Sequence, residues 1–215
     1  MKKLGILVLL LAAALSASAH VINYEVEQLS KGGVVWKYIA AGFTHIIPLG
    51  LDHILFIACI FFLNKDIKKV VLQASMFTLA HSVTLGLAMY GVINPPANVI
   101  EPLIALSIAM LAVENMLSEK VKPWRLAMVF VFGLIHGMGF AGALSEFGLP
   151  SYAFATALIS FNVGVELGQL AIIGALYFLV SRIFSQKLWY RKAIVIPASV
   201  VIASVALYWT VERMM

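Results

Sequence analysis

The sequence has little cysteine, little charge and no nucleotide-binding loop. Cys59 is the single cysteine among 215 residues, which excludes an internal disulfide and a metal cluster held by cysteines. No G-x-x-x-x-G-K-S/T loop is present, so nothing indicates an ATP-driven motor. Charged residues make up only 12% of the chain, whereas hydrophobic residues make up 62%. This balance is typical of a multi-pass membrane protein and argues against a globular domain with a single core.

Residues 1–19 have the three parts of a secretory signal peptide. Two lysines precede an apolar stretch, and Ala-Ser-Ala at 17–19 resembles an A-x-A cleavage site. We expect cleavage there rather than a retained anchor, so the mature chain would begin at His20. An amine beside this imidazole could chelate copper or nickel, although an ordinary terminus is the simpler interpretation. Residues 20–33 form a short polar lead-in outside the membrane.

Six apolar segments follow, and each is long enough to cross a bilayer as a helix. They cover residues 34–63, 70–92, 99–117, 124–147, 151–181 and 193–211. The sequence therefore predicts an all-α bundle of six transmembrane helices over residues 34–215.

Basic residues alternate between the connections. Those after the first, third and fifth segments contain Lys65, Lys68, Lys69, Lys120, Lys122, Arg125, Arg182, Lys187, Arg191 and Lys192. The turns at 94–98 and 148–150 contain none. The positive-inside rule places the basic connections in the cytoplasm, and a cleaved signal peptide requires the same orientation. We therefore expect a protein of the bacterial inner (cytoplasmic) membrane whose mature N- and C-termini face the periplasm.

The first apolar segment contains the stretch GFTHIIPLGLDH. His45, Asp52 and His53 lie at positions i, i+7 and i+8, so an unbroken helix would present all three on one face. Pro48 and Gly50 favour a kink instead, because proline removes a backbone N–H and clashes with the preceding turn. Ionisable groups and freed backbone groups at this depth usually face a bundle interior or a wet cavity.

Other segments bring further polar side chains to a similar depth. The second and fourth segments each have a central histidine, and the fifth has a polar stripe. Four of the five histidines are thus intramembrane, which predicts a shared metal site. Its predicted ligands are His45, Asp52, His53, His81, His136 and Glu166, and the candidate coupling or exit groups are Glu114, Asn115, Asn162 and Gln169. For Glu114 and Glu166 the alternative is a hydrogen-bonded carboxyl that holds helices together.

The donor types limit the ligand. Imidazole and carboxylate suit nickel, cobalt, zinc or iron, whereas copper(I) prefers sulfur ligands. A G-x-G-x-x-G match at 137–142 lies inside an apolar segment and follows no soluble strand, so we expect no organic cofactor. Glycines four apart, Gly133 with Gly137 and Gly164 with Gly168, predict close helix packing. The partners expected are the lipid bilayer and a metal ion, with no nucleic acid.

Five stretches together resemble the HupE/UreJ family of membrane proteins. They are GFTHIIPLGLDHILF at 42–56, FTLAHSVTL at 77–85, the third segment with Glu101 and Glu114-Asn115, FGLIHGMGFA at 132–141 and FNVGVELGQ at 161–169. The resemblance implies a secondary transporter or permease for nickel or cobalt, associated in some members with hydrogenase or urease maturation.

The metal-associated motif of that family resembles H-P-x-x-G-x-D-H. His45 corresponds to its first histidine, and Asp52 and His53 correspond to its final pair. This sequence departs from the motif, because its proline is Pro48 and one extra residue separates His45 from Asp52. The departure changes the ligand geometry, so it bears on which metal is carried.

Three functions remain open. Polar groups spread through the depth of the bundle favour transport, with His45 at the outer entrance. An intramembrane zinc hydrolase is an alternative, because three histidines, an aspartate and Ser82 beside His81 could hold zinc and an activated water. The third is a metal-binding partner subunit or sensor without flux.

Overall fold

The protein is described by a computed structural model that covers residues 26–64 and 66–215. Over these residues it contains helices and no strand, which confirms the expected all-α class. The signal peptide predicted for residues 1–19, and His20, lie outside the described residues. The helices are α2 (Lys31–Ile46), α3 (Leu51–Leu63), α4 (Ile67–Met89), α5 (Ala97–Leu117), α6 (Arg125–Gly139), α7 (Ala141–Phe147), α8 (Phe154–Leu176), α9 (Arg182–Phe184) and α10 (Ile196–Glu212). Short 3₁₀ and π turns, η1 (Ser151–Ala153), η2 (Tyr177–Ser181) and η3 (Arg191–Val195), extend α8 and α10.

Four continuous helical segments are long and apolar enough to cross a membrane. They are Ile67–Met89, Ala97–Leu117, Ser151–Phe184 and Arg191–Glu212. A fifth span results if α2 and α3, which meet at a bend of 69°, count as one. The expected segment 124–147 is divided into α6 and the short α7, and the count of six spans stays a prediction.

The outer faces of the long helices are apolar, as lipid contact requires. Leu79 and Val83 of α4 and Ile159 and Val163 of α8 are all exposed. On each helix these residues are four apart and so share one face. Together with the helix lengths, they identify a multi-pass membrane protein.

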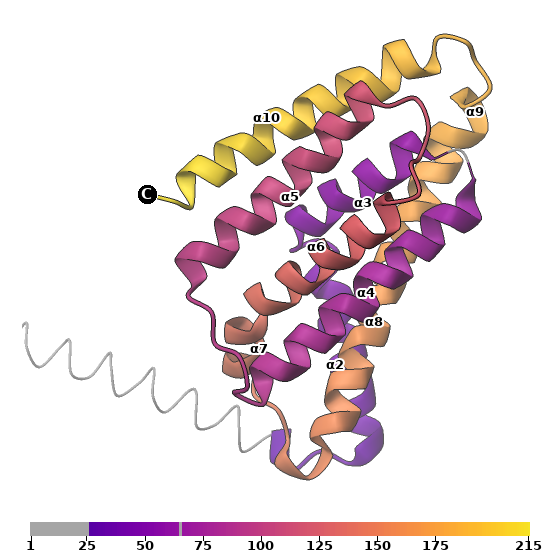
Figure 1. The fold of residues 1–215 in the computed structure, drawn as a ribbon. Coiled ribbons are helices and arrows are strands. Elements are labelled where there is room, and N and C mark those ends of the chain that lie inside the picture. The colour runs from indigo at the N-terminus through magenta and orange to yellow at the C-terminus, as the bar shows by residue number, and fades with distance from the viewer. Residues whose placement is uncertain (1–25, 65) are drawn as a thin grey trace, which may run out of the picture.

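Three helix pairs surround a central helix. α2 packs along α8, α4 along α6, and α5 along α10, and α3 contacts α4, α5 and α8 between them (Figure 1). Accordingly, α3 is buried over most of its length, including all residues from Phe56 to Phe61. The site described below lies where α3 begins.

Glycine allows the closest approach within two of these pairs. A Cβ atom added at Gly42 or Gly164 would overlap backbone of the facing helix in the α2–α8 pair. Added at Gly133 or Gly137, it would overlap backbone of α4 in the α4–α6 pair. The close packing predicted for Gly133, Gly137 and Gly164 is therefore present, because only a residue without a side chain fits between such helices.

The break expected in the first apolar segment is also present. α2 ends at Ile46 and α3 begins at Leu51, so Pro48 and Gly50 lie in the connection. Within it, the Gly50 N–H donates to the Ile46 carbonyl at 3.2 Å. Asp52 and His53 therefore belong to a different helix from His45, and the single helical face no longer relates them.

The basic connections lie at one end of the bundle. The α3–α4, α5–α6 and α9–α10 connections gather there, and the α4–α5 connection and α7 lie at the other end (Figure 1). One of the basic residues departs from expectation: Arg125 is not a solvated loop charge but is completely buried. It is the first residue of α6 and turns into the bundle, where Glu114 of α5 pairs with it.

Candidate metal-binding site

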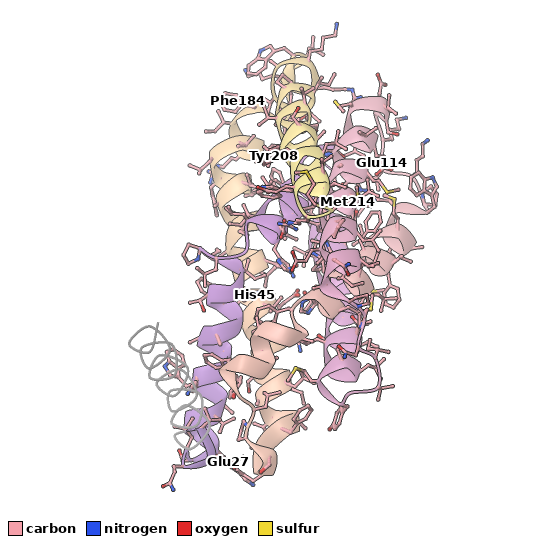
Figure 2. The ribbon with its side chains drawn as sticks, turned by 90° about the vertical axis from the view of Figure 1, so that its left-hand side faces the viewer. Glu27, His45, Glu114, Phe184, Tyr208 and Met214 are labelled. Atoms are coloured by element: carbon pink, nitrogen blue, oxygen red, sulfur yellow. The ribbon has the colours of Figure 1, made fainter. Side chains whose placement is uncertain are left out.

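Three histidines converge from three helices. His45 comes from the last turn of α2, His53 from the first turn of α3, and His81 from the middle of α4. One ring nitrogen of each lies within 4.8 Å of the corresponding atoms of the other two. Figure 2 shows His45 between Glu27, near one end of the molecule, and Phe184, near the other.

The spacing of these nitrogens is close to what one metal ion needs. Two ligands held about 2.1 Å from a tetrahedral ion would be about 3.4 Å apart. The distances between the ring nitrogens therefore need to shorten by about 1 Å for a tetrahedral ion, which small rotations of the rings would allow. The ring centroid of His53 lies 4.7 Å from that of His45 and 5.8 Å from that of His81.

At least one ring nitrogen of each imidazole is buried without a hydrogen-bond partner among the described residues. Nε2 of His45, Nε2 of His53 and both ring nitrogens of His81 have none. His53 is 6% exposed and His81 is fully buried. A buried polar atom left unpaired costs on the order of 1–3 kcal/mol, so such atoms need an explanation. A bound cation that accepts the nitrogen lone pairs is one that fits.

His136 of α6 extends the group to a fourth helix. Its ring centroid lies 5.3 Å from that of His53, and Nε2 lies 3.0 Å from the Ser107 hydroxyl oxygen. When that hydroxyl donates its one hydrogen to the Ile104 carbonyl at 2.7 Å, it accepts from Nε2–H of His136 in the corresponding tautomer. In this tautomer Nδ1, which is buried without a partner, is the nitrogen with the free lone pair.

Phenylalanines enclose the four imidazoles. Phe140 and Phe161 flank His45, with ring centroids at 3.8 and 5.6 Å. Phe77 contacts His53, His81 and His136, and Phe56 contacts His136. Such apolar walls lower the local dielectric constant and so strengthen the electrostatic interactions of any ion that enters.

Asp52 is not a member of the three-histidine group. Both of its carboxylate oxygens accept from Nη2 of Arg213, at 3.1 Å each. The ion pair borders a cavity of about 240 Å³. The polar residues lining it are His45, Asp52, His53, Glu101, His136 and Arg213.

Glu166 likewise lies outside the histidine group. Its two carboxylate oxygens accept from the hydroxyls of Ser75 and Thr78 on α4, at 2.6 Å each. Thr78 lies one turn before His81, and Gln169 donates to its hydroxyl oxygen at 2.9 Å. Asn162 donates to the Leu158 carbonyl of its own helix. These groups form a second polar layer between α4 and α8.

Glu114 and Asn115 bind a buried guanidinium. Arg125 pairs with Glu114 and also donates to Asn115 Oδ1, the Gln73 side chain and the Cys59 carbonyl. Asn115 itself donates to the same carbonyl at 2.9 Å. This arrangement matches the alternative weighed for Glu114, a carboxyl that holds helices together.

Sequence reasoning missed Ser107, Arg125 and Arg213. Ser107 is a lone hydroxyl in an apolar segment, which is a weak signal for a site residue. Arg213 follows the last apolar segment directly, where a solvated charge is the ordinary expectation.

The fold and this site define a class: a multi-pass all-helical membrane protein with an intramembrane imidazole cluster suited to a transition metal. Within that class, the chain belongs to the HupE / UreJ protein family, whose model matches residues 21–213. The family comprises permease-type membrane proteins of nickel or cobalt uptake. Comparison with curated proteins and with solved structures found no match.

Proposed function

We propose that this protein is a secondary transporter for a divalent transition-metal ion, with nickel or cobalt as the favoured substrate. The observation that carries the proposal is the set of buried, unpartnered imidazole nitrogens on α2, α3 and α4. Neutral imidazoles bind such ions, and phenylalanines pack around the rings.

The polar groups suggest an order of passage. The ion reaches Asp52 at the cavity, passes to His45, His53 and His81, and then meets the Glu166 layer. A permeant ion must bind well enough to enter but weakly enough to leave. Successive sites of different ligand type, carboxylate and then imidazole and then carboxylate, meet that requirement. Glu114 lies beyond this route, held by Arg125.

The same proposal includes the location of the protein. A cleaved signal peptide and the basic connections at one end of the bundle support six spans in the bacterial inner membrane, with those connections in the cytoplasm. Protease accessibility of the α5–α6 connection in sealed vesicles of known orientation would test this arrangement.

Flux into proteoliposomes tests the function. Nickel, cobalt, zinc, iron(II) and manganese are offered in parallel to the wild type and to His53→Ala and His81→Ala. We expect flux of one or two ions and a loss of more than about tenfold in each variant, since even an outer-shell partner of a metal ligand is worth 10–100-fold in metal affinity. The matched control is Ser199→Ala, a buried polar residue of α10 outside the cavity, which should retain flux. Wild-type rates in both histidine variants would refute the proposed site.

The three-histidine group is also compatible with the hydrolase alternative, since three imidazoles form a known catalytic zinc site. Against it, the Ser82 hydroxyl donates to the Thr78 carbonyl at 2.6 Å and so is engaged with its own helix. Zinc-dependent cleavage of a lipid ester or amide, lost in His81→Ala, would favour this function. Saturable metal binding without flux would instead favour a sensor or partner subunit.

A further inference from the structure

The cavity beside the histidines already holds a cation of the protein's own. Arg213 caps the C-terminal end of α10, where its backbone N–H bonds to the carbonyls of Trp209 and Val211. Its side chain crosses to α3 and binds both oxygens of Asp52. The carboxylate beside His53 is therefore neutralised before any metal arrives.

The pair lies at the open edge of the site. The side chains of Arg213 and Asp52 are 22% and 25% exposed, whereas His81 and His136 are at most 2% exposed. An ion that approaches the histidines through this cavity meets the guanidinium first. A dication and a guanidinium at one carboxylate repel each other, so an ion that binds Asp52 favours release of the arginine.

In the same conformation the guanidinium has two further contacts that do not depend on Asp52. Its central carbon lies 5.2 Å from the centroid of the Trp209 ring, which is within the range of a cation–π interaction. Nη1 reaches toward the Glu101 carbonyl at 3.4 Å. A small rotation about the side chain would release Asp52 while the charge stays over the tryptophan.

We infer that Arg213 is a tethered competitor that occupies Asp52 in the empty protein and that an incoming divalent metal ion must displace. This inference rests on the proposed function and adds a specificity-determining residue to it. An ion that also binds the imidazoles beyond Asp52 gains enough binding free energy to replace the guanidinium. An ion that uses oxygen ligands alone, such as Mg²⁺, gains only the carboxylate and is rejected.

The test measures cobalt(II) binding to the purified full chain in detergent by its visible absorption, together with cobalt flux in proteoliposomes. Arg213→Gln removes the competitor and should tighten cobalt binding by about two- to fivefold, the range expected for a partly exposed ion pair. Added Mg²⁺ should then weaken cobalt binding more in Arg213→Gln than in the wild type. Arg213→Lys keeps the charge and should restore exclusion of Mg²⁺.

Two further comparisons separate displacement from a structural role. In an Asp52→Asn background, Arg213→Gln should change cobalt binding by less than twofold, because the pair no longer exists. Arg182→Gln neutralises an exposed arginine on α9 outside the cavity and should leave cobalt binding unchanged. Should Arg213→Gln fail to fold, Arg213→Met, which keeps the aliphatic stem, takes its place.

Failure of the displacement inference and failure of the proposed function give different results. If the wild type binds and carries cobalt but Arg213→Gln has unaltered cobalt affinity and Mg²⁺ sensitivity, the displacement inference is overturned and the proposed function stands. The displacement inference is also overturned if Arg213→Gln raises cobalt affinity as much in the Asp52→Asn background as in the wild type. If the wild type neither binds nor carries any of the offered ions, the proposed function fails, and the inference fails with it.

Discussion

Alanine substitutions at two glycines of α8 should have opposite effects on stability. A Cβ atom at Gly164 would overlap the carbonyl oxygen of Ile39 and lie 2.8 Å from the backbone nitrogen of Phe43. Both are backbone atoms of α2, so neither can rotate away and the helices must separate. At Gly174 on the same helix, no atom lies within 4 Å of the added Cβ.

The magnitudes follow from two terms. Both substitutions gain about 0.5–1 kcal/mol, because alanine loses less conformational freedom than glycine in a helix. Gly164→Ala also carries the cost of overpacking, about 1–3 kcal/mol. The entropic gain is the same in both variants and cancels when they are compared with each other. Gly164→Ala should therefore be about 1–3 kcal/mol less stable than Gly174→Ala.

Reversible unfolding in mixed micelles, followed by tryptophan fluorescence, measures this difference. Cobalt binding provides a second reading, because α2 carries His45 and its displacement should widen the histidine group. Gly164→Ala should therefore bind cobalt more weakly, whereas Gly174→Ala should match the wild type. Equal unfolding free energies for the two variants, within about 0.5 kcal/mol, would show that the α2–α8 contact is looser than described.

Two further predictions concern buried polar groups. Glu114→Met should lower the unfolding free energy by about 3–5 kcal/mol, because it leaves the Arg125 guanidinium charged and unpaired. Arg125→Met should cost less, since the remaining carboxyl can take up a proton whereas a guanidinium cannot lose one; the reverse order in urea or SDS unfolding would contradict this account. Ser107→Ala should weaken cobalt binding about 10–100-fold by releasing the His136 ring, and Ser204→Ala, an exposed hydroxyl of α10 bonded within its own helix, is the control. An unchanged cobalt affinity in Ser107→Ala would exclude His136 as a ligand held by this hydroxyl.

Local steric rules explain which features could be predicted from the sequence. The break near Pro48 follows from a missing backbone donor, and the close helix contacts follow from glycines four apart. Both depend on residues adjacent or one turn away in the sequence. That His45, His53 and His81 would come together could be expected from their positions along the apolar segments, because a helix rises by a fixed amount per residue.

Side-chain partners that are distant in sequence could not be predicted. Depth placed Asp52 beside the histidines, but its partner Arg213 is 161 positions further along the chain. Arg125 was expected in a solvated loop, because whether it is buried depends on where α6 begins and on Glu114 across the bundle. Glu166 shares its depth with the site, yet its position on α8 directs it to hydroxyls of α4.

The arrangement of the helix pairs has a mechanical consequence. His45 belongs to the α2–α8 pair, whereas His81 and His136 belong to the α4–α6 pair, and the two helices of each pair are in close contact at glycines. If one unit tilts against the other, the distance between His45 and His81 changes while both glycine interfaces stay intact. The four-residue connection 47–50 would absorb the tilt. The hydrogen bonds from Ser75 and Thr78 to Glu166 connect α4 with α8, so such a tilt would have to break or stretch them.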